Sequence, residues 1–167
     1  MRLYLPEIVR ANKPLVREET IEFEGIEREV PQLVRLDPVR VRVKALEENG
    51  LFHVSAEQRA RAVLTCSRCL SPFEKTLSGQ WTQVFTNRAD RAEEGEICFV
   101  EGDHIDLTPY VREAVLLEIP YAPVCREECR GLCPECGADR NRETCSCRTE
   151  RIDPRLAVLK ELQIPED

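Results

Sequence analysis

The stretch that decides the fold is residues 35–69, which read RLDPVRVRVKALEENGLFHVSAEQRARAVLTCSRC. In its first part valines alternate with arginine and lysine, and this period of two predicts a half-buried strand over residues 35–43. Asn49-Gly50 predicts a tight turn, because both residue types adopt positive φ readily. Alanine and leucine then alternate with arginine along a return strand that leads into a pair of cysteines. The stretch therefore predicts a β-hairpin with one apolar and one basic face.

Further strands are predicted on both sides of this hairpin. Residues 1–32 hold scattered apolar positions interrupted by prolines, which predicts one or two short strands or extended arms and little helix. Residues 73–85 predict the strand after the cysteine pair, so that the cysteines lie at the tip of a second hairpin. Residues 97–107, with Gly102-Asp103 near their centre, predict a third, short hairpin.

Two helices are predicted in the C-terminal half. Thr108-Pro109 is a helix start, with threonine as N-cap and proline at the first helical position, and it predicts a helix near residues 109–119. Asp153-Pro154 repeats this signal. Leucines spaced by three residues then predict a short amphipathic helix at the C-terminus.

The fold class predicted from these elements is α+β. It consists mostly of an antiparallel β meander with one or two short helices and a C-terminal zinc-ribbon-like module. Residues 1–124 are expected to form the β-rich domain, and residues 125–167 the cysteine-rich module with its C-terminal helix. A chain of 167 residues has room for one domain with such an appendage.

Composition sets the expected compartment and narrows the function classes. No run of about 18 apolar residues is present, so no membrane span is expected, and the N-terminus lacks the pattern of a signal peptide. A cytoplasmic location is therefore expected. The net charge of −7 argues against bulk attraction to nucleic acid, but much of the acidity lies in residues 90–120, which leaves room for a basic face elsewhere.

The nine cysteines are the strongest signal for a metal site. Thiols stay reduced in the cytosol, so clustered cysteines there are read as metal ligands before disulfides. One predicted tetrahedral zinc site takes its ligands from the C-terminal module: Cys133, Cys136, Cys145 and Cys147. A second site would join the hairpin tip to the start of the module: Cys66, Cys69, Cys125 and Cys129. Two structural zinc ions are therefore expected.

Alternatives remain open for both sites. In the first, only one of Cys145 and Cys147 ligates and Cys129 completes the set. In the second, Cys66 and Cys69 form a redox pair or a plain reduced pair. The redox reading is disfavoured because such pairs usually open a helix, whereas these two cysteines lie between strands. Cys98 is expected to be a buried core thiol.

Enzymatic activity is not expected. The only histidines, His53 and His104, are not at ligand spacing, and no phosphate-binding loop, nucleophile elbow or carboxylate pair is evident. A zinc site with four sulfur ligands is closed and structural. No small-molecule substrate is therefore predicted.

Binding to an anion is better supported. Basic side chains share the outer face of the predicted hairpin, where like charges repel unless an anion covers them. The candidate nucleic-acid-binding residues are Arg40, Arg42, Lys44, Arg59, Arg61 and Arg68. A solvated polar face is an equally valid interpretation. Aromatic content of 5% gives no sign of a base-stacking surface.

The sequence also resembles a known family. The runs GLCPECG, NRETCSC and IDPRLAVLKEL, preceded by LTCSRCLSPF, are similar to signatures of the YceD family of large ribosomal RNA subunit accumulation proteins. The resemblance covers roughly the C-terminal two thirds of the chain. It implies a cytoplasmic factor for accumulation or processing of large-subunit (23S) rRNA, with a pre-ribosomal particle, rRNA or a ribosomal protein as partner.

Three functions follow from these observations. The leading one is a non-enzymatic ribosome-assembly factor. The second is a zinc-ribbon adaptor that binds only protein, with the acidic loop 90–103 as its contact surface. The third is a thiol redox protein that uses Cys66 and Cys69.

Overall fold

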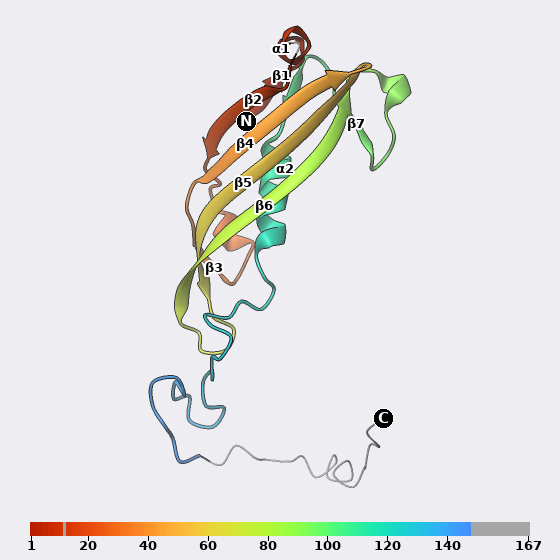
Figure 1. Cartoon of the computed structure of the whole chain (residues 1–167). Coiled ribbons are helices and arrows are strands. Elements are labelled where there is room, and N and C mark those ends of the chain that lie inside the picture. Colours follow the sequence, from red (N-terminus) through yellow and green to blue (C-terminus); the bar gives the residue numbers. More distant parts are fainter. Residues whose placement is uncertain (12, 148–167) are drawn as a thin grey trace, which may run out of the picture.

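The computed structural model describes residues 1–11 and 13–147. One long twisted sheet forms the body, a helix lies along one of its faces, and the cysteine-rich segment extends from one end (Figure 1). The strands lie in the order β2, β4, β5, β6, β7, and β3 also pairs with β5. Their bounds are β2 (Leu15–Ile21), β3 (Leu33–Leu36), β4 (Val39–Glu48), β5 (Leu51–Thr65), β6 (Pro72–Thr86) and β7 (Ile97–Phe99).

The β4–β5 hairpin confirms the prediction from residues 35–69, with one difference. The valines of β4 are buried and the basic residues between them are exposed. Asn49 and Gly50 form the turn with φ of 55° and 79°. The predicted strand, however, is split at Asp37-Pro38, because proline has no N–H for the ladder. The N–H of Asp37 donates to the carbonyl of Arg61, so β3 and β4 follow one another along β5.

The predicted third hairpin, over residues 97–107, is wrong. Its first half is β7, which pairs in parallel with β6, so the large sheet is not a pure antiparallel meander. Its second half is β8 (His104–Asp106), which pairs with β1 (Arg2–Tyr4) in a separate two-stranded sheet. The cause is non-local: Leu3 and Ile105 lie opposite each other, and both are buried. A short helix, α1 (Leu5–Arg10), follows β1.

Helix α2 (Thr108–Glu118) confirms the predicted helix but begins differently. Leu107 is the N-cap, and the threonine expected there is already helical. Oδ1 of Asp106 accepts hydrogen bonds from the backbone N–H and the hydroxyl of Thr108, so Asp106 satisfies the helix start. The helix ends at Glu118, before Pro120 as predicted.

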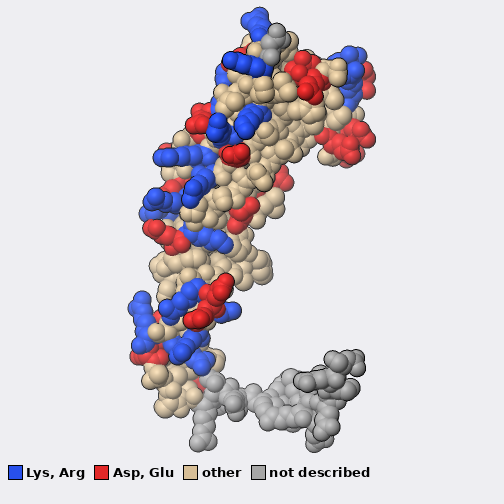
Figure 2. All heavy atoms as spheres, in the orientation of Figure 1, with Lys and Arg blue, Asp and Glu red and all other residues tan. Residues whose placement is uncertain are grey.

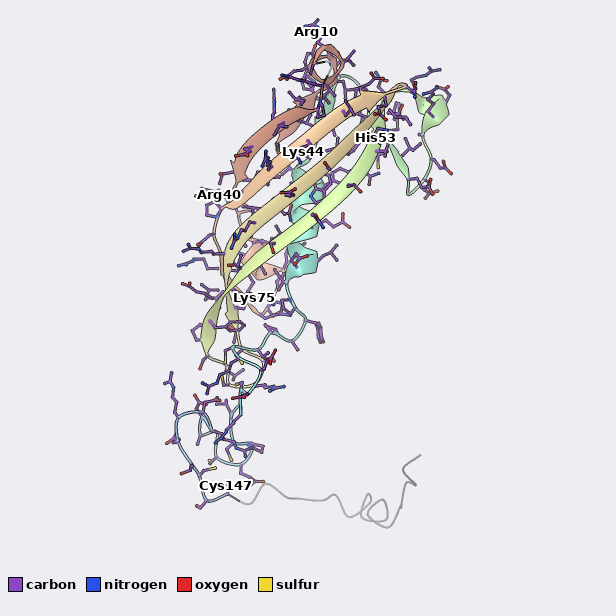
Figure 3. All side chains as sticks on the ribbon, in the orientation of Figure 1. Arg10, Arg40, Lys44, His53, Lys75 and Cys147 are labelled. Atoms are coloured by element: carbon purple, nitrogen blue, oxygen red, sulfur yellow. The ribbon has the colours of Figure 1, made fainter. Side chains whose placement is uncertain are left out.

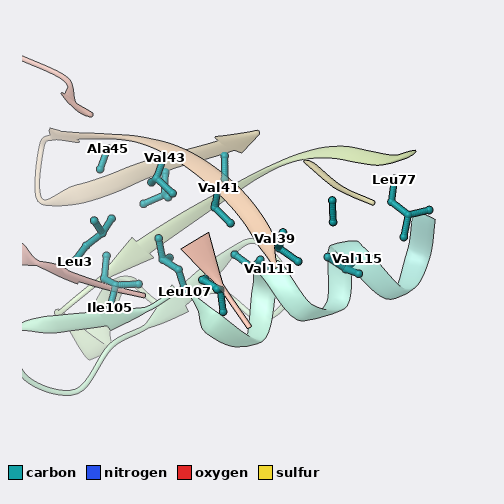
Figure 4. Packing of buried hydrophobic residues seen from close by; sticks show 14 of the residues in the cluster. Leu3, Val39, Val41, Val43, Ala45, Leu77, Ile105, Leu107, Val111 and Val115 are labelled. Atoms are coloured by element: carbon teal, nitrogen blue, oxygen red, sulfur yellow. The ribbon is translucent and has the colours of Figure 1, made fainter. Parts of the chain in front are cut away.

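The core lies between the sheet and α2. Val111 and Val115 of α2 pack against the inner face of the sheet, where the β4 valines point toward the helix (Figure 4). Gln58 is buried in this layer, and it donates to the carbonyl of Val111 and accepts from the indole N–H of Trp81. Both polar ends of Gln58 are therefore satisfied, and the side chain fixes the helix against β5 and β6.

Replacing Val115 with alanine should lower the free energy of unfolding by about 2 kcal/mol, because two buried methyl groups leave a cavity. Val115 is 2% exposed. Leu117→Ala is the matched control, since Leu117 lies on the same helix at 79% exposure and its loss should change little. Urea denaturation of both variants measures the difference. Equal decreases in the free energy of unfolding of the two variants would contradict the packing of α2 on the sheet through Val115.

No helix among the described residues is long and apolar enough to cross a membrane. The helix predicted after Asp153-Pro154 lies outside the described residues.

Candidate metal centres and basic sheet face

The first cysteine cluster (Cys66, Cys69, Cys125 and Cys129) ties the tip of the β5–β6 hairpin to the segment after α2. Its four sulfur atoms all lie within 4.8 Å of one another. Sγ of Cys66 lies 3.9 Å from Sγ of Cys129, and Sγ of Cys69 lies 3.8 Å from Sγ of Cys125. The backbone N–H of Cys125 also points at Sγ of Cys66, at 3.4 Å. Residues more than fifty positions apart therefore share one site.

The geometry of the first cluster fits a tetrahedral ion better than disulfides. Zn–S bonds of about 2.3 Å place the sulfurs of a tetrahedron about 3.8 Å apart, whereas a disulfide needs about 2.0 Å. All nine cysteines are free. Burial raises the pKa of Cys66, but backbone N–H groups of Cys69, Cys125 and Arg68 outweigh it and bring the pKa to about 6. One sulfur is therefore ready to ligate at neutral pH.

The second cysteine cluster (Cys133, Cys136, Cys145 and Cys147) lies within the module itself, and its sulfurs also lie within 4.8 Å of one another. Gly137 has a φ of 77°, and its N–H donates to the carbonyl of Cys133, which closes a tight knuckle. Backbone N–H groups of Cys136 and Glu135 lower the pKa of Cys133 to about 6.

The structure groups the cysteines into the same two sets of four as the spacing predicted. Cys129 lies in the first cluster, so the alternative in which it completes the second is not favoured. Cys145 and Cys147 both reach the second cluster. The neighbouring Cys136 thiol, followed by burial, raises the pKa of Cys147 to about 12, because crowded thiols disfavour a further negative charge. Cys98 is half-buried at the edge of the main core and belongs to neither cluster.

Arg68 connects the hairpin tip to the module and lies apart from the basic face. Its guanidinium donates to the carbonyls of Glu127 and Cys129, at 3.0 and 3.1 Å, and its own carbonyl accepts from the N–H of Leu132. Gly131 lies so close to the hairpin tip that an added Cβ would be 2.8 Å from the carbonyl oxygen of Arg68. Of the six candidate nucleic-acid-binding residues, Arg68 thus has a structural role in holding the module.

Gly131→Ala should lower the melting temperature more than Gly137→Ala. Both glycines have positive φ, 70° and 77°, so each alanine costs about 1–2 kcal/mol of backbone strain. Only at Gly131 does the new methyl group also collide with the hairpin tip, since nothing lies within 4 Å of the Cβ position at Gly137. Thermal unfolding of the two variants under the same conditions makes the comparison. An equal drop would show that the contact with Arg68 can relax.

The other five candidates share the face of the sheet that points away from α2: Arg40, Arg42, Lys44, Arg59 and Arg61. Figure 2 shows Lys and Arg side chains gathered over β2, β4 and β5 on this face. Figure 3 shows Arg40 and Lys44 along β4 in the same view. Arg40 lies directly opposite Arg59 in the β4–β5 register. The predicted repulsion of like charges across the hairpin is therefore present in the fold.

Neutralising partners on this basic face are few. Arg42 forms an ion pair with Glu18 at 3.4 Å, and Glu57 lies opposite Arg42 on β5. Among the described residues, the other four basic side chains have no ion pair. Depressions hollow this face in three places: one of about 1040 Å³ is lined by Arg40, Arg42 and Arg59 and also by glutamates, one of about 800 Å³ lies near Arg61, and one of about 390 Å³ lies beside Lys44.

Two features of these sites were missed in the sequence. β6 adds a row of uncharged hydrogen-bonding groups beside the basic residues: Thr76, Ser78, Gln80 and Thr82. Their alternation with residues of the inner face is visible in the sequence and could have indicated this row. Asn141, which contacts a sulfur of the first cluster, carries no such signal, because only the folded loop brings it there.

The fold and sites together define a class: a β-sheet scaffold with an open basic face and two four-cysteine clusters at one end. The chain belongs to the family described as large ribosomal RNA subunit accumulation protein YceD, whose model matches residues 54–163. This confirms the resemblance found in the sequence.

Three relatives illustrate the range of this similarity. An uncharacterised protein of Mycobacterium tuberculosis is 38% identical over 130 residues, 75% of this chain and 61% of the relative. YlbN of Bacillus subtilis, also uncharacterised, is 32% identical over 157 residues, covering 90% of this chain and 88% of YlbN. The chloroplastic large ribosomal RNA subunit accumulation protein YCED homolog 1 of Arabidopsis thaliana is 35% identical over 156 residues, 75% of this chain and 49% of that protein.

The chain spans 61% of the length of the Mycobacterium tuberculosis and Mycobacterium bovis relatives that it matches, which is less than two thirds. No solved structure is similar to it.

Proposed function

We propose that this protein is a non-enzymatic ribosome-assembly factor that supports accumulation of large-subunit rRNA by binding rRNA on the basic face of its sheet. The observation that carries the proposal is the open face, on which four basic side chains form no ion pair with any described residue, in a family described by large-subunit rRNA accumulation. Arginine and lysine contact RNA mainly through phosphates, and hydroxyl and amide groups such as those of β6 add hydrogen bonds.

The binding mode follows from what the face lacks. Trp81 of β6 lies on the opposite face of the sheet, where it stacks on Tyr110 of α2 with ring centroids 5.6 Å apart. Base stacking is therefore no part of the proposed contact, and binding should depend on salt and little on sequence. The expected site of action is the cytoplasm.

The two cysteine clusters have a supporting role in this proposal. Each offers four sulfurs at distances suited to Zn²⁺, which would bind as a closed structural ion and supply no open position for chemistry. We assign residues 1–124 to a sheet domain that binds RNA, and residues 125–167 to a module held on it by the first cluster. The grouping of Cys66 and Cys69 with two further cysteines supports a metal site over a redox pair.

The proposal is tested by depleting the protein in its own host and measuring the ratio of large- to small-subunit rRNA. A falling ratio, restored by the wild-type gene, is the expected result, together with sedimentation of the protein with large-subunit precursors. An unchanged ratio, with the protein only at the top of the gradient, would count decisively against it.

A protein-binding adaptor is the second candidate, and one surface favours it. Leu70 and Tyr121 are 62% and 95% exposed, and they border a groove of about 810 Å³ between the hairpin tip and the end of α2. The acidic loop 90–103 is the other candidate contact for a basic partner. Crosslinking in cells separates the candidates, because an adaptor alone would crosslink to protein and give no RNA adduct.

A further inference from the structure

The side chain of Asn141 bridges the two cysteine clusters. Asn141 belongs to the loop between the two cysteine pairs of the second cluster, yet its Nδ2 donates to Sγ of Cys129 in the first, at 3.5 Å. Its Oδ1 accepts hydrogen bonds from the backbone N–H of Arg130 and from Nη2 of Arg126, both at 2.9 Å. One side chain therefore holds the segment that carries Cys129 and also contacts the sulfur itself.

The second cluster fixes the position of Asn141. Oδ1 of Asp139 accepts hydrogen bonds from both the backbone N–H and Nδ2 of Asn141, at 2.9 and 2.7 Å. Asp139 in turn forms a β-bridge with Leu132, the residue just before Cys133 of the knuckle. The loop 137–144 thus starts and ends at the second cluster, so closing that cluster brings the two ends of the loop together.

We infer that Asn141 is a positioning residue that couples the two clusters, so that metal binding by the second raises the metal affinity of the first. This inference rests on the metal assignment proposed above. An N–H donor to a ligating sulfur orients it and offsets its charge, and loss of such a partner typically weakens metal binding about 10–100-fold. Coupling of this kind is reciprocal.

Cobalt titration of the full-length protein tests the coupling, because Co²⁺ bound by thiolates absorbs light and reports each site. The double variant Cys133→Ser/Cys136→Ser leaves the first cluster as the reporter, and Cys66→Ser/Cys69→Ser leaves the second. We expect loss of the second cluster to lower the cobalt affinity of the first roughly tenfold or more. Asn141→Ala should lower it similarly in the otherwise intact chain. In the Cys133→Ser/Cys136→Ser variant, adding Asn141→Ala should lower the cobalt affinity of the first cluster little further.

The variant Asn141→Asp distinguishes the effect of losing the N–H donor from the effect of losing side-chain packing. Aspartate keeps an acceptor for Arg126 and Arg130 but replaces the N–H donor with a carboxylate facing the sulfur of Cys129. Asn141→Asp should therefore lower the cobalt affinity of the first cluster at least as much as Asn141→Ala does. Asn87→Ala, in the loop after β6 at the far end of the sheet, is the control and should change neither affinity.

Three outcomes overturn the inference. If both clusters bind cobalt with affinities that are independent of each other and of Asn141, the coupling is wrong while the metal assignment stands. If neither cluster binds cobalt or zinc, both are wrong. Normal affinity of the first cluster in Asn141→Asp would likewise exclude the proposed donor.

Discussion

Replacing Cys69 with serine should reduce the metal content from two ions to about one per chain and release the module from the sheet. Cys69 is 7% exposed, and its sulfur lies 3.8 Å from that of Cys125. A serine hydroxyl stays protonated at neutral pH and does not replace a thiolate. Structural zinc sites couple on the order of 10 kcal/mol of binding energy to folding, so loss of a ligand should have a large effect.

The effect of this substitution should be local. The cysteines of the first cluster form an apolar cluster of their own, with Phe73 and Val124 against it, apart from the core between the sheet and α2. The sheet should therefore stay folded while the chain around Arg126 and Arg130 becomes accessible. Limited trypsin digestion followed by mass spectrometry would detect new cuts at these two arginines.

Cys98→Ser is the matched control, because Cys98 is half-buried but belongs to neither cluster. Its metal content and its cleavage pattern should equal those of the wild type. Two ions retained in Cys69→Ser, with no new cleavage, would remove the first cluster as a metal site and as the attachment of the module.

The parts of the fold that were predictable depend on local patterns. The β4–β5 hairpin is specified by the alternation of valine with basic residues and by Asn49-Gly50, all within one short stretch. The two sets of cysteines follow from pair spacing together with the hairpin that places Cys66 near the module. In the hairpin, sequence neighbours already determine which side chains point the same way, whereas the first cysteine set also joins residues more than fifty positions apart.

The parts that were not predictable depend on contacts between distant segments. Nothing near residues 97–107 shows that β7 pairs in parallel with β6, or that β8 pairs with β1 because Leu3 needs Ile105 as a buried partner. The contact from Asn141 to Cys129 likewise joins two segments that only the folded loop brings together. Such tertiary contacts override local turn signals such as Gly102-Asp103.

Arg59→Glu should weaken RNA binding about tenfold while leaving the fold as stable as before or slightly more stable. Arg59 lies directly opposite Arg40, and like charges at such positions are destabilising, whereas a Glu–Arg pair contributes roughly 0.2–1 kcal/mol. A residue kept for stability would behave in the opposite way. A loss of RNA affinity together with an unchanged or higher free energy of unfolding would therefore show that the arginine pair serves binding.

The measurement is a salt titration of binding to a labelled fragment of large-subunit rRNA, with urea denaturation of the same samples. The wild-type affinity should fall steeply between about 50 and 200 mM salt, and each lost phosphate contact should reduce the slope of log K against log salt by about 0.7–0.9.

Lys75→Glu makes the same change in charge. Its β5 partner Ala62 is buried on the inner side of the sheet, so Lys75 lies off the basic face and this variant should bind RNA normally (Figure 3). If Arg59→Glu and Lys75→Glu weakened binding equally, only net charge would matter, and the basic face would lose its role.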